Sequence, residues 1–387
     1  MQIGVSVAII SQMKSIRFIC LMFFLLTSWL AIAQPEPSRR RPASTQPTPP
    51  EFIIGIWYPP IASHALWKAR GCNTCVGFEH QTNTVTMQQW SESAAGEGLF
   101  VIRPPLEKMA EDVTNPYLLA WMHQFDEPDL KGIDPEHLQD VYQQWKKVDP
   151  KREIFITISG GSLLFKKTSH NVYKEYFKAA DWIGNDFYPI TGWNQPTWIA
   201  RLGLAVEDCR TLSKGKPQFA FIETSSQKLD WLPKNTRGPT AGEVRAEIWE
   251  AVIHGVKGII YFPQQFNPFK YDATPDDVSV ELARQNRLLV KLSPIITLPA
   301  NPKEIEIGTS GMVDVGWRQA ADGSVYIIAV NISGDKIKAH NLRVKSDQKF
   351  ALVDSVLPDK KPLVIENTTL TFDLDPFEVA IWHVKKS

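Results

Sequence analysis

Two glutamates follow apolar runs and could form a catalytic pair. Glu127 lies in "AWMHQFDEPD", where the acids and a proline come after an apolar segment, and Glu223 directly follows "FAFI". Two facing carboxyl groups suit cleavage of a glycosidic bond, because one must donate a proton to the leaving oxygen while the other attacks the anomeric carbon. Like charges close together resist double ionisation, which separates the two pKa values. Taken alone, each acidic motif is also typical of a surface loop. Whether the two glutamates form a pair therefore depends on the strands and helices that carry them.

The middle of the chain alternates short β-rich runs with amphipathic helical segments, which indicates parallel βα units. The helical segments include residues 106–113 and "PEHLQDVYQQWKKV", which follows an Asp-Pro start. Eight runs are typical of strands, and each precedes such a segment. In chain order they are "FIIGIWY", "CNTCVGF", "LFVIRP", "LLAWMHQFDEP", "EIFITIS", "DWIGNDFYPI", "PQFAFIETS" and "KGIIYFPQQF".

Eight βα units within residues 51–300 predict an α/β fold of the (β/α)8 TIM barrel type. An open doubly wound sheet is the alternative, but it often has a glycine-rich phosphate turn after its first strand, where this chain has "WYPPIAS". Residues 301–387 change to short alternating strands, with a hairpin turn expected at residues 321–323. This part predicts a C-terminal antiparallel β-sandwich domain.

Catalytic groups of such barrels lie where the strands end and the following loops begin. Glu127 then ends the fourth strand and Glu223 the seventh, so both reach the same face of the barrel. Aromatic side chains at strand ends suit the apolar faces of pyranose rings, and polar ones suit their hydroxyl groups. The candidate substrate-binding residues are Trp57, His80, Arg103, Asp126, Asp186, Tyr188, Trp193, Tyr261 and Gln265.

Three of these candidates have a plain structural alternative. Tyr188 could be a core tyrosine, Arg103 could pair with a surface acid, and His80 could be a loop histidine without a role.

The predicted barrel resembles the clan A retaining glycoside hydrolases over residues 52–298. The Glu-Pro of "FDEPD" implies that Glu127 is the acid/base, and "FAFIETS" implies that Glu223 is the nucleophile of a double displacement. Tyr188, in "NDFYP", lies near the place where clan members often have an aromatic residue that hydrogen-bonds the nucleophile. Asp126 departs from the pattern, because the clan usually has an asparagine there that contacts the sugar 2-hydroxyl. The resemblance implies a poly- or oligosaccharide substrate and no cofactor.

Two other functions compete with this interpretation. A non-catalytic barrel could bind carbohydrate in the same cleft without turnover. A metal-dependent barrel hydrolase is disfavoured, because no HxH pair or His/Asp cluster with ligand spacing stands at a predicted strand end, and no metal is expected.

The N-terminal segment predicts export. Residues 1–33 contain Lys14 and Arg17 before an apolar run that ends in Ala-Ile-Ala, which is typical of a secretory signal peptide. An uncleaved membrane anchor is the alternative. Residues 34–50 are proline-rich and predict a disordered linker.

Charge and cysteine content limit the partners. The 42 basic and 42 acidic residues balance, so neither a nucleic acid nor a stable membrane partner is expected, while the oligomeric state is left open.

Cys72, Cys75 and Cys209 follow the signal segment, and their odd number argues against a disulfide framework. The CxxC pair could bind a metal or act in redox chemistry, but its apolar surroundings favour buried thiols.

Overall fold

The computed structural model describes most of the chain after its N-terminal segment. The described residues are 46–78, 84–233, 236–301, 306–307, 312–345, 349–359, 361–367 and 369–386. The predicted signal peptide, most of the predicted linker and the candidate His80 lie outside these ranges, and residues 46–50 have no regular structure. Among the described helices, none combines the length and the apolar character that crossing a membrane requires.

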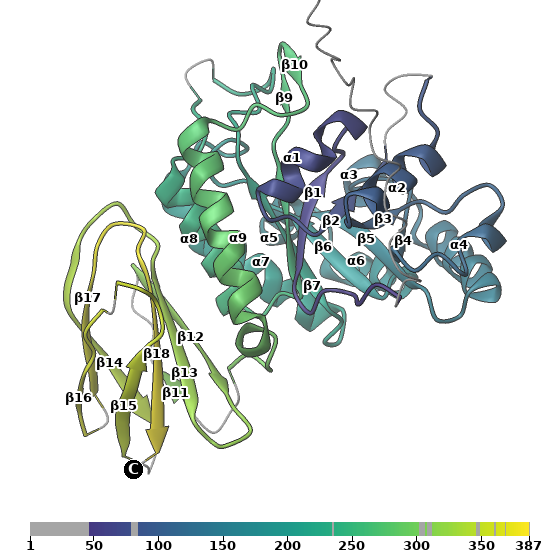
Figure 1. Cartoon of the computed structure of the whole chain (residues 1–387). Helices are drawn as coiled ribbons and strands as arrows, with labels where there is room; N and C mark the ends of the chain where they lie inside the picture. Colours follow the sequence, from purple (N-terminus) through teal and green to yellow (C-terminus); the bar gives the residue numbers. More distant parts are fainter. Residues whose placement is uncertain are drawn as a thin grey trace, which may run out of the picture. The chain divides into compact units, whose positions relative to one another are not determined.

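Eight parallel strands close into a barrel in the order β1 to β8, which confirms the predicted TIM barrel (Figure 1). Strand β8 pairs with β1, with Gly258 opposite Ile53, and so completes the ring. The strands are β1 (Ile53–Trp57), β2 (Thr74–Val76), β3 (Phe100–Arg103), β4 (Leu118–Met122), β5 (Glu153–Ser159), β6 (Trp182–Asp186), β7 (Gln218–Glu223) and β8 (Gly258–Phe262).

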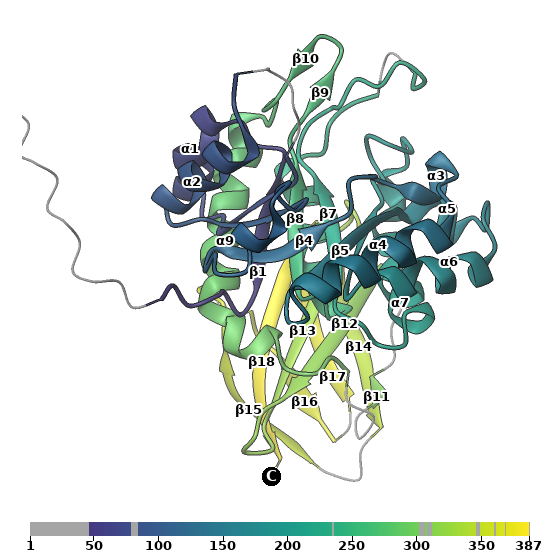
Figure 2. The same ribbon diagram turned by 90° about the vertical axis from the view of Figure 1, so that its right-hand side faces the viewer.

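Helices surround the barrel on its outside (Figure 2). Their starts carry capping signals: Asp134 accepts a hydrogen bond from Glu136 N before α4, and Thr240 and Glu243 form a capping box that starts α8. The helices are α1 (His64–Ala69), α2 (Met87–Gly96), α3 (Pro128–Lys131), α4 (Pro135–Val148), α5 (Gly160–Leu164), α6 (His170–Tyr176), α7 (Ile199–Leu212), α8 (Ala241–Ile253) and α9 (Asp276–Ile296).

The helix predicted over residues 106–113 is wrong, because this segment contains only a 3-10 turn at Met109–Glu111. The physical reason is Asp112, whose carboxylate is buried and accepts hydrogen bonds from the Arg103 guanidinium, Leu106 N and Trp121 Nε1. The segment folds around this buried acid, which a regular surface helix would expose to solvent.

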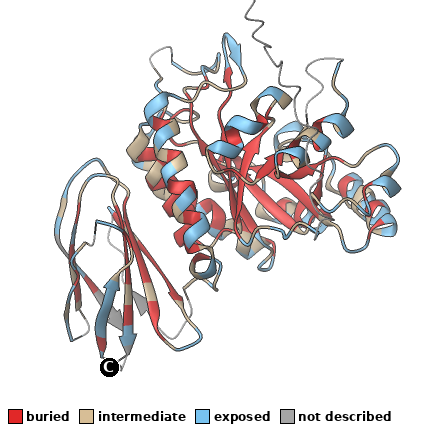
Figure 3. Ribbon diagram, in the orientation of Figure 1, coloured by how far each residue is buried: buried red, intermediate tan, exposed pale blue. Residues whose placement is uncertain are grey.

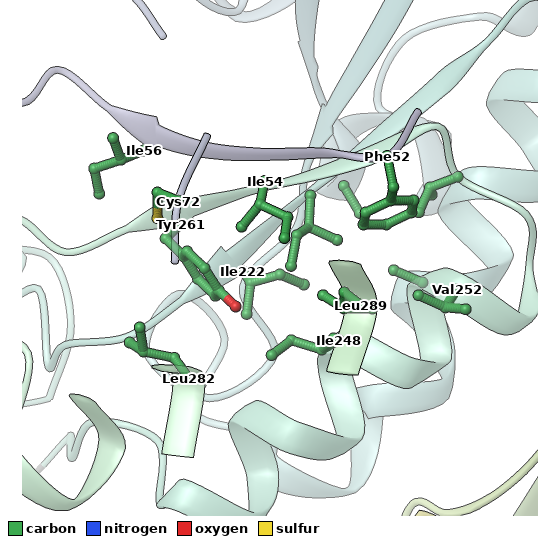
Figure 4. Close-up of a cluster of buried hydrophobic side chains, with 14 of the residues drawn as sticks. Phe52, Ile54, Ile56, Cys72, Ile222, Ile248, Val252, Tyr261, Leu282 and Leu289 are labelled. Carbon is green, nitrogen blue, oxygen red and sulfur yellow. The ribbon is translucent and has the colours of Figure 1, made fainter. Parts of the chain in front are cut away.

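The core has an inner and an outer layer, and the barrel strands are buried on both faces (Figure 3). Residues such as Phe155, Phe219 and Phe221 fill the barrel interior. Residues of the opposite pleat, such as Ile54 and Ile222, pack outward against the helices (Figure 4). Cys72, Cys75 and Cys209 are buried free thiols, as the interpretation of the sequence expected.

A second set of strands forms two four-stranded antiparallel sheets, which confirms the predicted sandwich. The predicted hairpin turn joins β12 to β13, and Gly323 adopts a left-handed φ of 81° there. The strand orders of the two sheets are β11-β14-β17-β16 and β12-β13-β18-β15. The strands are β11 (Glu306–Ile307), β12 (Val313–Gln319), β13 (Val325–Asn331), β14 (Ile337–Lys345), β15 (Phe350–Ser355), β16 (Val364–Glu366), β17 (Thr369–Leu374) and β18 (Val379–Lys386).

Candidate active site

A pocket of about 970 Å³ opens where the barrel strands end. It is rich in aromatic and apolar side chains, with a few polar groups among them, as expected for a site that binds a sugar ring. The hairpin formed by β9 (Gln265–Phe266) and β10 (Phe269–Lys270) follows β8 and contributes two aromatic rings. The lining residues are Trp57, Tyr58, Phe78, Met87, Pro104, Met122, Gln124, Asp126, Lys131, Phe262, Gln264, Phe266 and Phe269.

Two of the candidate residues, Trp57 and Asp126, therefore lie in the pocket wall. Trp57 is the last residue of β1, and its ring contacts Tyr58 and Phe221 at centroid distances of 4.3 and 5.0 Å. Asp126 accepts a 2.8 Å hydrogen bond from the Thr157 hydroxyl on the neighbouring strand β5. This bond fixes the Asp126 carboxylate at the edge of the pocket.

Glu127 directly follows Asp126 and caps the N-terminus of α3. Its backbone is left-handed, with φ 47° and ψ 61°, and its N–H points at the Thr157 hydroxyl at 3.4 Å. Burial, followed by the charges of Asp126 and Asp129, raises the pKa of Glu127 to about 8. Glu127 is therefore largely protonated at neutral pH, which is the state that a general acid requires.

A third acid, Asp186 at the end of β6, belongs to the same cluster. Burial and then the negative charge of Glu127 hold the pKa of Asp186 well above its usual range, so the two carboxyl groups influence one another. One carboxylate oxygen of Asp186 and the Tyr188 hydroxyl are buried without a hydrogen-bond partner among the described residues. The Tyr188 hydroxyl is close enough to offset part of the Asp186 shift, although its geometry falls short of a hydrogen bond. Neither residue belongs to the pocket wall.

Glu223 ends β7 with the pleat orientation of Phe219 and Phe221, which face the barrel interior. The side chain is fully buried and is not part of the pocket wall. Its oxygens accept 2.7 and 2.6 Å hydrogen bonds from Ile190 N and Thr191 N, and the Thr191 hydroxyl also donates to it. Burial raises the pKa of Glu223, and these hydrogen bonds act in the opposite direction.

Two candidate substrate-binding residues, Arg103 and Tyr261, are buried and bonded within the protein. Arg103 is 1% exposed and forms a 2.6 Å ion pair with Asp112. This contact resembles the structural alternative, except that the acid is buried. Tyr261 is fully buried outside the barrel, among the apolar side chains of Figure 4. Its hydroxyl donates a 2.7 Å hydrogen bond to Asn286. Both residues stabilise the fold and have no free polar group for a substrate.

Trp193 and Gln265 also lie outside the pocket wall. The Trp193 ring packs against Phe165 and Trp198 at centroid distances of 4.7 and 6.0 Å, so its aromatic face is used within the protein. Gln265 is 5% exposed and donates a 2.9 Å hydrogen bond to Pro268 O, which braces the β9–β10 hairpin. The two residues shape loops near the strand ends and do not face the pocket.

Three residues of the site were missed in the sequence. Thr157 and Ser159 are polar residues at alternate positions of the otherwise apolar run "EIFITIS", which was the available signal. Ser159 N donates to the Asp129 carboxylate at 3.1 Å, so β5 holds both acidic neighbours of Glu127. Lys131 lies in the pocket wall, and its ammonium group donates to the Asp126 carbonyl oxygen.

The β9–β10 hairpin allows a test of sugar stacking that leaves the core intact. Phe266 lies in the pocket wall and is 45% exposed, so we expect Phe266→Ala to raise KM about 5–20-fold, the loss of about 1–2 kcal/mol of ring stacking, with little change in the melting temperature. Trp231→Ala is the matched control, because Trp231 is 77% exposed and does not line the pocket. Equal KM values for the two variants would contradict the assignment.

Comparison with known proteins identifies a family that the middle of the chain resembles. Residues 136–278 match the family model Glyco_hydro_42, described as beta-galactosidase, of clan A. The chain is a glycoside hydrolase-like (β/α)8 barrel. The matched segment runs from α4 into α9 and includes Asp186 and Glu223, whereas Glu127 precedes it. The resemblance to clan A that the motifs indicated is thus confirmed, and it supports an enzyme of the glycoside hydrolase type.

Solved structures share the barrel's fold at low sequence identity. A Bacteroides fragilis protein assigned as an alpha-galactosidase/melibiase has a TM-score of 0.57 and 11% identity, over 87% of this chain and 79% of that one. A second assigned alpha-galactosidase from the same species has a TM-score of 0.53 and 10% identity, over 87% and 80%. The alpha-amylase from H. orenii has a TM-score of 0.51 and 9% identity, over 87% and 100%. No curated protein sequence matches the chain.

Proposed function

We propose that the protein is an exported glycoside hydrolase that cleaves O-glycosidic bonds of a poly- or oligosaccharide with retention of configuration. One observation carries the proposal: Glu127, whose pKa is raised to about 8, directly follows Asp126, and Asp126 lies in the wall of an aromatic-lined pocket at the barrel mouth. A protonated carboxyl group beside a sugar-binding surface is what departure of the leaving group requires. Export rests on the sequence of residues 1–33 alone.

In the first step, Glu127 donates its proton to the glycosidic oxygen while Glu223 attacks the anomeric carbon and forms a glycosyl ester. In the second step, the Glu127 carboxylate takes a proton from water, which attacks the same carbon and releases Glu223. Asp126 accepts hydrogen bonds from sugar hydroxyls in place of the usual asparagine. Asp186 and Tyr188 bind further hydroxyls through the buried atoms that lack partners within the described part of the chain.

The role of Glu223 has a structural requirement. Glu223 is fully buried and lies outside the pocket wall, so the segment that binds it through Ile190 N and the N–H and hydroxyl of Thr191 must shift before the carboxylate can reach a substrate. The same donors favour an ionised carboxylate, which is the state that a nucleophile needs. The start of the β6–α7 loop is therefore the part of the site that must adjust when substrate binds.

A digestion screen tests the proposal. We expect the full-length protein to release reducing sugars from at least one member of a broad panel of polysaccharides and aryl glycosides, and to keep doing so in the presence of a chelator. Glu127→Gln should bind the same glycan in an affinity gel without cleaving it. Binding by the wild-type protein without turnover on any member would instead favour the non-catalytic barrel.

A further inference from the structure

A histidine and three carboxylates meet where the barrel helices contact the sandwich. Glu250 and His254 are one turn apart at the C-terminal end of α8, and Asp314 lies on β12 of the sandwich. His254 Nε2 is 2.9 Å from Asp314 Oδ2 and 3.3 Å from Glu250 Oε1. Because α8 begins near the end of β7 and runs back toward the start of β8, this cluster is at the opposite end of the barrel from the pocket.

We propose that Glu250, His254 and Asp314 bind a divalent cation of the zinc type, which joins the barrel to the sandwich. The ligand atoms of the three residues all lie within 4.8 Å of one another. Tetrahedral zinc with bonds of 2.0–2.1 Å places its ligand atoms about 3.3 Å apart, close to the spacing around His254 Nε2. The i, i+4 spacing of Glu250 and His254 presents both side chains on one face of α8.

A third acid, Glu207, orients the histidine. Glu207 on α7 is 2.7 Å from His254 Nδ1, so this nitrogen donates its proton to the Glu207 carboxylate. The lone pair of Nε2 then points toward Asp314 and Glu250 in the neutral imidazole. A carboxylate on the far nitrogen of a metal-binding histidine is the usual outer-shell arrangement, because it fixes the ring and increases its basicity.

Glu250 supplies an independent reason for a cation. Its side chain is fully buried, and neither carboxylate oxygen has a hydrogen-bond partner in the described part of the chain. A proton on His254 Nε2 could form a hydrogen bond with only one of the two facing carboxylates. The nitrogen is closer to Asp314 than to Glu250. A metal ion at this point would bind both, and would satisfy a buried carboxylate that is otherwise costly.

Helix α7 leaves room for the cluster. A side-chain carbon on Gly203 would lie 2.3 Å from His254 Cδ2 and 2.5 Å from Glu250 Oε1, so only glycine permits this approach. The nearby arginines do not replace the cation: Arg210 donates to His254 O and Arg318 to Val252 O, at the end of α8. Among the described residues, the ion pairs of Glu250 and Asp314 are formed with His254 alone.

Zinc binding by the full-length chain tests the proposal directly. After incubation with Zn²⁺ and desalting, we expect about one zinc per wild-type chain and a melting temperature that rises with zinc concentration. Asp314→Asn should lower zinc affinity at least 100-fold, and because Asp314 is partly exposed this variant is expected to fold. Glu207→Gln should lower the affinity about 10–100-fold, as for an outer-shell residue.

His137→Gln is the matched control, since His137 is exposed on α4, and it should bind zinc like the wild type. Cys72 and Cys75 remain in every variant, so zinc retained by Asp314→Asn would belong to these thiols and would overturn the proposal. Absence of zinc from the wild-type protein, with a melting temperature insensitive to Zn²⁺, would show that protons alone hold the cluster together.

Discussion

Glu127→Gln should lower kcat for glycosides with poor leaving groups by about 10²–10⁴-fold, because the amide cannot donate a proton. The loss should be much smaller for dinitrophenyl glycosides, whose leaving group departs without protonation. In the wild type, kcat/KM should fall as pH rises through about 8, since Glu127 then loses the proton that it must donate. Initial rates on the two substrate classes across the pH range measure both effects.

The charge of Asp126 allows an internal check of this assignment. That charge helps to raise the pKa of Glu127, so Asp126→Asn should move the upper pH limb to lower pH. Glu136→Gln, a change of an exposed acid in the first turn of α4, should leave the profile where it is. Wild-type turnover by Glu127→Gln would remove Glu127 from the mechanism. An upper limb that does not move in Asp126→Asn would belong to another group.

A 2-deoxy-2-fluoro glycoside of the matching sugar should inactivate the enzyme and label Glu223. The fluorine slows both the formation and the hydrolysis of the glycosyl ester, while the good leaving group accelerates its formation only. The intermediate therefore accumulates, and peptide mapping by mass spectrometry locates it. Glu223→Gln should reduce kcat by more than about 10³-fold, since loss of a covalent nucleophile is among the largest single-residue losses in hydrolases. In Glu223→Ala, whose shorter side chain leaves room for the anion, azide should restore turnover and give the inverted glycosyl azide.

Asp186 is the carboxyl group that would replace Glu223 if this prediction is wrong. It ends the neighbouring strand β6, and burial, followed by the charge of Glu127, raises its pKa. A label on Asp186, together with an active Glu223→Gln variant, would move the nucleophile to β6. Thr191→Ala is the matched control for the contacts around Glu223, because it removes one hydroxyl donor and keeps the carboxylate.

The barrel could be predicted from the sequence because its strands are buried on both faces and appear as short apolar runs between helical patterns. The predicted strand ends indicated which residues lie at the mouth of the barrel, and Trp57 and Asp126 are indeed in the pocket wall. The strand ends did not indicate whether a side chain faces the barrel interior or the surrounding helices. Tyr261 alternates with Ile260 and Phe262, which face the interior, so pleat alternation would have excluded it.

Arg103 follows the same rule, since Ile102 faces the interior. The contacts of Glu223 could not be predicted, because they come from the backbone of a loop more than 30 residues earlier in the chain. Loop backbone donors leave no pattern in side-chain types. The same holds for Asp314, whose contact with His254 depends on how the sandwich packs against α8.

The left-handed backbone of Glu127 lowers the stability of the fold at a residue that the proposed mechanism requires. A φ of 47° suits glycine or asparagine and strains a glutamate. Burial, followed by the charges of Asp126 and Asp129, also makes ionisation of its carboxyl group unfavourable, as the raised pKa shows. A smaller uncharged residue at this position would relax the turn between β4 and α3. The residue to which the proposed chemistry assigns proton donation therefore lowers the stability of the turn that carries it.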